Sequence, residues 1–189
     1  MTWANAKIKR IYVGTNLVYP IWKPSSNTQI YMPLNWNAND YSWNWKNGTA
    51  SNITWDSWWK WWCASFNGSS SYISFPSLTT TSNTTINCWI KTTMSGTGEI
   101  IQLCTSTKSL EIYVSSWKSQ LVLYNNWQTA YVVTGTSSLS MDYSNNRIWL
   151  HTNWHSNPYS WYIDNLIIES KTWTLDEVQD FYNTNKSNY

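Results

Sequence analysis

The residues of this chain that could do acid–base chemistry are few and widely spaced. The chain has four glutamates, Glu99, Glu111, Glu169 and Glu177. None of them has a second acid at i+2 or i+4 on a predicted strand. Hydrolysis of a glycosidic bond needs two carboxyl groups about 5–5.5 Å apart with retention, or about 6.5–9.5 Å apart with inversion. Asp176 and Asp180 do flank Glu177, but on a predicted helix, where acids near the N-terminus suit the helix dipole. We therefore expect no catalytic residues and no enzyme.

The histidines and cysteines form no metal or nucleophile pattern. His151 and His155 are the only histidines, and the segment between them is predicted as strand and turn, so we expect a surface or hairpin role. The three cysteines are Cys63, Cys88 and Cys104, an odd number without metal-ligand spacing. Each falls in an apolar strand pattern, where a free cysteine acts as a small hydrophobic residue.

The composition excludes two classes of partner. The chain has 189 residues, 12% of them charged, with a net charge of +2, and its only basic run is Lys7–Arg10. A nucleic-acid interface needs clustered Lys and Arg, so we expect none. No apolar run approaches the roughly 20 residues of a membrane-spanning helix, and residues 1–7 lack a signal-peptide core. We expect no membrane contact.

Short strands separated by turn signals must position whatever site the chain has. Asn67-Gly68 lies between two apolar runs, 64–66 and 72–75, and predicts a hairpin with a type I′ turn. The run 84–91 places Ile86, Cys88 and Ile90 on one face of a strand. Many further strands of this kind, rich in Ser, Thr and Asn turns, indicate an all-β protein.

One helix is predicted near the C-terminus, over 174–183. Thr174 and Glu177 have the spacing of a capping box, so the helix begins at Thr174. The apolar side chains at i, i+3, i+6 and i+7 predict a single face that docks on the strands, and they are Leu175, Val178, Phe181 and Tyr182.

Several of these motifs together resemble one family. "ASFNGSSSYISFP", "TTINCWIK" and the closing "YIDNLIIE…WTLDEVQDFY" are similar to the laminin G-like, concanavalin A-like lectin domains. The resemblance covers residues 27–185 and implies a two-sheet antiparallel jelly-roll sandwich with one C-terminal helix. Residues 1–26 are predicted to be a separate β-hairpin and linker. The string "KIKRIYVGTNLVYPIWKP" within them is similar to short N-terminal segments of phage tail proteins.

The resemblance also implies candidate sites. Such domains often hold Ca²⁺ through loop oxygens, which Asn39, Asp40 and Asp164 could supply, although each Asp could equally be a hydrogen-bonded anchor. Exposed aromatic side chains on a jelly roll are typical of sugar stacking. The predicted loop that would bind sugar is Asn125, Asn126, Trp127 and Gln128, unless Trp127 is an ordinary core or edge residue.

These features favour a non-catalytic binding or adhesion module that recognises glycan or a surface protein. It would lie outside the cell or on a virion, where residues 1–26 could contact other virion proteins. The rival interpretations are a purely structural decoration domain of a virion and, less favoured, a degenerate glycoside hydrolase.

The tryptophan content is itself anomalous, with 17 Trp against 6 Gly. Several stand where the resembling family has glycine: Trp36, Trp43, Trp45, Trp117, Trp154, Trp161 and at least one of 58–62. Trp55, Trp89 and Trp173 instead match bulky positions. One hypothesis is that the source organism reads UGA as glycine and that this sequence was translated with UGA as tryptophan. The other is that the indoles form a sugar-binding surface, which would gather them on one exposed face.

Overall fold

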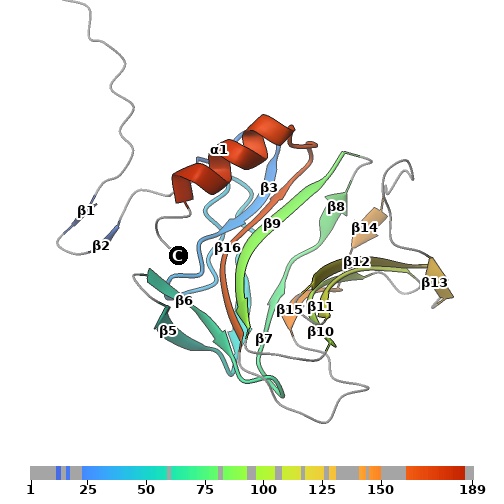
Figure 1. Cartoon of the computed structure of the whole chain (residues 1–189), viewed down its shortest axis with the longest axis horizontal. Coiled ribbons are helices and arrows are strands. Elements are labelled where there is room, and N and C mark those ends of the chain that lie inside the picture. Colours follow the sequence, from blue (N-terminus) through green and yellow to red (C-terminus); the bar gives the residue numbers. More distant parts are fainter. Residues whose placement is uncertain are drawn as a thin grey trace, which may run out of the picture.

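The structure, a computed structural model, describes residues 12–13, 16–17, 23–58, 61–80, 83–92, 97–104, 108–115, 118–125, 128–130, 141–143, 145–149 and 161–185. Two antiparallel sheets face each other, and a single helix in the described part, α1 (Leu175–Asn185), lies across the outer side of one of them (Figure 1). The predicted all-β sandwich with one C-terminal helix is confirmed.

The larger sheet has seven strands. In spatial order they are β13 (Gln128–Ala130), β12 (Lys118–Asn125), β11 (Lys108–Ser115), β10 (Thr97–Cys104), β15 (Asn145–Trp149), β7 (Tyr72–Phe75) and β4 (Thr49–Ser51). β11 and β12 form a hairpin, since Ser115 pairs with Lys118.

The smaller sheet has five strands arranged around its longest one, β16 (Trp161–Glu169). The others are β3 (Thr28–Met32), β6 (Trp61–Phe66), β5 (Thr54–Trp58) and β9 (Thr85–Thr92). Both β3 and β6 pair with β16, at opposite halves of its length, and β9 pairs along nearly all of it. Two further pairs are short: β14 (Met141–Tyr143) with β8 (Leu78–Thr80), and β1 (Tyr12–Val13) with β2 (Asn16–Leu17).

The core lies between the two sheets. Alternate residues of their strands meet there, including Ile30 and Met32 from β3 and Ile73 and Phe75 from β7. The predicted apolar face of β9 is confirmed, because its members pack on this core: Ile86, Cys88 and Ile90. Burial raises the pKa of the Cys88 thiol to about 12, so this cysteine stays protonated and inert.

The predicted hairpin at Asn67-Gly68 is wrong. β6 belongs to the five-stranded sheet and β7 to the seven-stranded sheet, so the segment between them is a corner of the sandwich. A type I′ turn needs positive φ at both central residues, whereas here only Gly68 has it, at 75°. Asn67 organises the corner instead, because its side-chain oxygen accepts hydrogen bonds from the backbone N–H groups of residues 69, 70 and 71.

The capping box at the start of α1 is confirmed. The Thr174 N–H donates to Glu177 Oε2 at 2.9 Å, and the Glu177 N–H donates to Thr174 Oγ1 at 3.3 Å. Lys171 also donates to the Glu177 carboxylate. Hydrogen bonds from Lys171 and the Thr174 N–H lower the pKa of Glu177 from its usual value.

Replacing Thr174 with alanine is expected to lower the free energy of unfolding by about 1 kcal/mol, because the Glu177 N–H then loses its side-chain acceptor. The contribution from Glu177 is present above its unfolded-state pKa and is lost as the pH falls through its lowered folded-state pKa. Urea denaturation at pH 7 and at pH 3 measures both effects. An equal loss for Thr174→Ala and Thr174→Ser would contradict the capping role.

The predicted docking face of the helix is only partly correct. Phe181 is buried against Tyr31, Ile167, Trp89 and Trp173. Tyr182 is half exposed and stacks on Trp89, with ring centroids 5.8 Å apart. In contrast, Leu175 and Val178 are exposed, because the helix rests on the sheet through its C-terminal half.

The short β1–β2 pair lies within the segment predicted as an N-terminal hairpin. The division of the chain at residue 26 remains a prediction. Among the described residues, no helix is both long and apolar enough to cross a membrane.

Candidate functional site

The loop between β3 and β4, residues 33–48, carries most of the exposed aromatic surface in the described part of the chain. We call it the aromatic loop. Four of the eight exposed large hydrophobic side chains belong to it, and they are Trp36, Tyr41, Trp43 and Trp45. Trp43 is 76% exposed and Trp45 is 81% exposed, so neither contributes to a core.

A fifth exposed aromatic residue, Trp62 of β6, contacts this loop. Its ring packs edge-on against Trp36, with centroids 6.4 Å apart. The contact arises because β3 and β6 both lie against β16, which places the residues that follow β3 next to β6. Such a pair of half-exposed indoles offers an apolar, π-rich surface to solvent.

Asp40 fixes the backbone of the aromatic loop. Its buried carboxylate accepts hydrogen bonds from the Tyr31 N–H at 2.9 Å, the Ser42 N–H at 2.8 Å, the Ser42 hydroxyl at 2.7 Å and the Lys46 N–H at 2.9 Å. Each oxygen therefore receives two donors. In the same loop, the Tyr41 N–H donates to the Tyr31 carbonyl, so this part of the loop is hydrogen-bonded to the backbone of β3. The aromatic side chains are held on a preformed loop.

This donor set bears on the predicted calcium site. The carboxylate of Asp40 has about four acceptor positions, and the four donors use them, so Asp40 does not fit as a cation ligand. Asn39 is exposed beside it. Asp164 lies in β16, and its carboxylate accepts from the backbone N–H and side-chain amide of Asn165. No cluster of three acidic, histidine or cysteine residues occurs among the residues that the structure describes. These contacts favour the hydrogen-bonded anchor alternative, and calcium binding remains a prediction.

The predicted sugar-binding loop falls at the turn from β12 to β13. Asn125 ends β12 and pairs in register with Gln128, the first residue of β13. Asn126 and Trp127 lie outside the described residues, as do His151 and His155, so their sites remain predictions. The sequence interpretation assigned sugar binding to residues 125–128, and it named three tryptophans of the aromatic loop, Trp36, Trp43 and Trp45, only under the alternative of an indole surface; the density of Trp and Tyr was the available signal.

Two of the four glutamates have described side chains, and both are engaged. Glu177 caps α1, and Glu169 is buried at the end of β16. Glu169 Oε1 accepts from the Ser25 and Thr28 hydroxyls at 2.8 and 3.0 Å, and Oε2 accepts from the Trp173 indole N–H. Neither glutamate is paired with a second carboxylate in these contacts.

Comparisons with known proteins bear on the fold. No protein-family model matches the sequence, and no curated protein matches it. Among solved structures, a botulinum neurotoxin type G receptor binding domain has a TM-score of 0.60 at 12% identity, over 84% of this chain and 51% of that one. The receptor binding domain of botulinum neurotoxin D has a TM-score of 0.56 at 13% identity, over 83% and 52%. This chain thus spans about half the length of those toxin domains.

A third likeness covers nearly the whole of the other chain. Domain 4 of AbnA, an extracellular arabinanase of family GH43 from Geobacillus stearothermophilus solved with arabinotriose, has a TM-score of 0.58 at 15% identity, over 82% of this chain and 98% of that one. At these identities the likenesses establish a shared β-sandwich fold and nothing finer.

Proposed function

We propose that this chain is a non-catalytic binding module that recognises carbohydrate through its aromatic loop. The observation that carries the proposal is the concentration of exposed Trp and Tyr side chains on a loop that Asp40 holds in place. Aromatic faces stack on the apolar faces of sugar rings, and a preformed loop loses little entropy on binding.

Further support comes from the structurally similar proteins and from the contacts of the two described glutamates. Domain 4 of AbnA was solved with arabinotriose, and the toxin domains are named for receptor binding. A hydrolase would need a pair of carboxylates, and Glu169 and Glu177 are instead engaged in the structural contacts described above. A location outside the cell or on a virion, a surface-protein partner, and attachment through residues 1–26 belong to the same proposal. So does a second sugar contact at residues 125–128.

Tyr41 is the residue of choice for testing the proposal, because its identity does not depend on how UGA is read. On a glycan array, the protein is expected to bind a defined subset of glycans. For the best of them, Tyr41→Ala should weaken binding roughly tenfold, equivalent to about 1.4 kcal/mol. The matched control is Leu175→Ala, which removes another exposed apolar side chain, from α1.

A reducing-sugar release assay on the same glycans separates binding from hydrolysis. We expect no release. Release that a single Glu→Gln substitution abolishes would replace the proposal with the hydrolase alternative. Absence of any array signal, with a folded protein by circular dichroism, would favour the structural decoration domain.

A further inference from the structure

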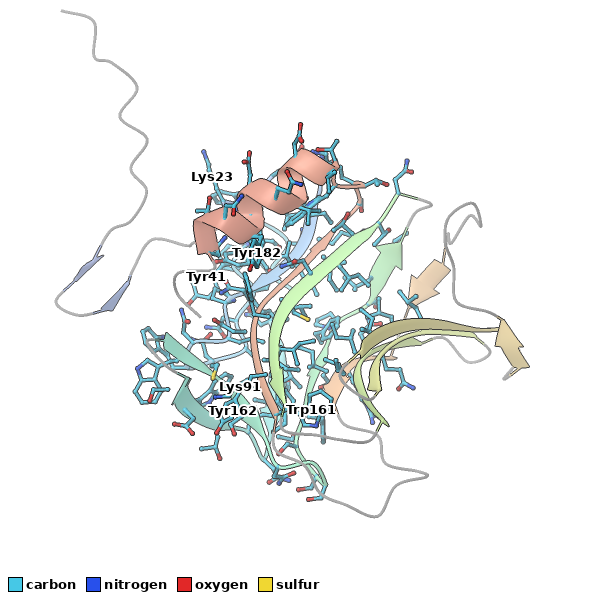
Figure 2. The ribbon with its side chains drawn as sticks, in the orientation of Figure 1. Lys23, Tyr41, Lys91, Trp161, Tyr162 and Tyr182 are labelled. Atoms are coloured by element: carbon cyan, nitrogen blue, oxygen red, sulfur yellow. The ribbon has the colours of Figure 1, made fainter. Side chains whose placement is uncertain are left out.

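A cleft of about 370 Å³ lies along α1, on the side away from the exposed Leu175. Its walls come from three parts of the chain: the segment before β3, the end of β16, and the helix. The lining residues include Lys23, Asn27, Glu169, Trp173, Asp180 and Asn185, and Figure 2 shows Lys23 beside the helix. The volume is at the lower end of the range of small-molecule sites.

Two acceptors at this cleft have unused capacity. Asn185 is 1% exposed, and its Nδ2 donates to the Phe181 carbonyl at 2.7 Å, which fixes the orientation of the amide. Its Oδ1 is buried and has no donor among the described residues. Glu169 is 3% exposed, and its Oε2 accepts one hydrogen bond where it could accept two. A ligand hydroxyl that donated to either oxygen would form a hydrogen bond that the buried oxygen otherwise lacks.

The charges at the cleft are mixed, and Lys171 is already paired with Glu177, so they give neither a cation nor an anion a clear advantage. Of the others, Glu169 and Asp180 repel an anion, while Lys23 opposes a cation. A neutral ligand meets neither penalty. Lys23 and Asn27 are exposed and can donate, and the rings of Trp173 and Phe181, 5.4 Å apart, supply an apolar wall.

From these contacts we propose that the cleft along α1 is a second binding site, separate from the aromatic loop, for a neutral polyhydroxylated ligand the size of a monosaccharide. Hydroxyl groups both donate and accept hydrogen bonds, so they can pair with the acceptor oxygens of Asn185 and Glu169 and with the donors of Lys23 and Asn27. A sugar ring also has an apolar face, which can pack on the Trp173 ring. The ligand class rests on the proposed function, but the site does not use the aromatic loop.

The indole N–H of Trp173 is a built-in reporter, because it donates to the same Glu169 oxygen that has an open acceptor position. In ¹⁵N-labelled protein, titration with L-arabinose and with D-galactose is expected to shift the Trp173 indole resonance in a saturable way. Asn27→Ala, which keeps the backbone carbonyl that accepts from the Ser170 N–H, should weaken that binding at least tenfold. Thr184→Trp should block it by filling the cleft.

The Tyr41→Ala variant distinguishes failure of the proposed aromatic-loop site from failure of the proposed site along α1. It is expected to lose array binding and to retain the sugar-induced shift of Trp173. If neither sugar shifts the Trp173 resonance at concentrations of tens of millimolar, the second site is excluded whatever the array shows. A shift produced by ethylammonium or by inorganic phosphate, but not by the sugars, would also overturn it. So would a sugar shift that is unchanged in both Asn27→Ala and Thr184→Trp.

Discussion

Replacing Asp40 with alanine is expected to lower the free energy of unfolding by about 3–5 kcal/mol. The carboxylate accepts four hydrogen bonds, three of them from backbone N–H groups at Tyr31, Ser42 and Lys46. Alanine would leave these donors without their acceptor inside a folded loop, and each unsatisfied buried group costs about 1–3 kcal/mol. Partial opening of the loop would let water hydrate some of these N–H groups, so the expected loss of stability is smaller than the sum of the individual costs. Chemical denaturation measures the loss directly.

The neighbouring residue provides a matched control. Asn39 is exposed, so Asn39→Ala should change stability by less than about 0.5 kcal/mol. The same pair of variants tests calcium. Because the Asp40 oxygens already have their donors, we expect the melting temperature to be the same in millimolar Ca²⁺ and in EDTA. A rise in melting temperature with Ca²⁺ that both variants abolish would contradict the anchor and establish the metal site.

If the aromatic loop binds glycan as proposed, loss of the anchor should also weaken that binding, even though Asp40 itself is buried. The reason is that the aromatic side chains would have to be ordered during binding rather than before it. Asp40→Asn is the milder variant for this measurement, since its amide retains one acceptor oxygen. Full-strength binding by an Asp40 variant with a destabilised loop would show that the aromatic loop is not the recognition surface.

Replacing Trp45 with glycine is expected to raise the free energy of unfolding by about 1–2 kcal/mol. Trp45 has a φ of 56°, in the left-handed region, where a residue with a Cβ is disfavoured by roughly that amount. Its side chain is 81% exposed and would give up little burial. Trp43 is the matched control, because it is nearly as exposed and is not among the described residues with positive φ. Trp43→Gly should be neutral or destabilising by up to about 1 kcal/mol.

This contrast bears on whether UGA encodes glycine in the source. Under that hypothesis, the codons at Trp36, Trp43, Trp45, Trp117, Trp154 and Trp161 are UGA, and those at Trp55, Trp89 and Trp173 are UGG. The contact between Trp36 and Trp62 is what the sugar-surface alternative expects. The nucleotide sequence decides, since UGG at Trp43, Trp45 and Trp154 would end the recoding hypothesis.

A glycine that the chain does have shows what this loop demands. At Gly48, a Cβ would lie 2.8 Å from Ile73 Cγ2 and 3.0 Å from the Ala38 Cβ, so no larger residue fits without movement. Glycine is thus required on steric grounds at Gly48 and favoured by conformation at Trp45, within a few residues of each other.

Local pattern was sufficient for the elements themselves. Period-2 alternation located β9 and its core face, and the Thr174–Glu177 spacing located the start of α1. Both depend on residues within a few positions of one another, so the sequence contains all that they need. The likeness of the closing motifs to lectin-like domains then indicated the sandwich.

Only the tertiary structure decided which strands pair and what the polar loop residues do. Alternation marks 64–66 and 72–75 as strands, but it is the same whether they join one sheet or two, and here they separate. The acceptor pattern of Asp40 includes Tyr31, nine positions away, and Glu169 is held by Ser25 and Thr28 from the opposite end of the chain. The exposure of Leu175 likewise depends on where α1 meets the sheet. These features depend on packing between residues far apart in the sequence, so the spacing of neighbouring residues does not predict them.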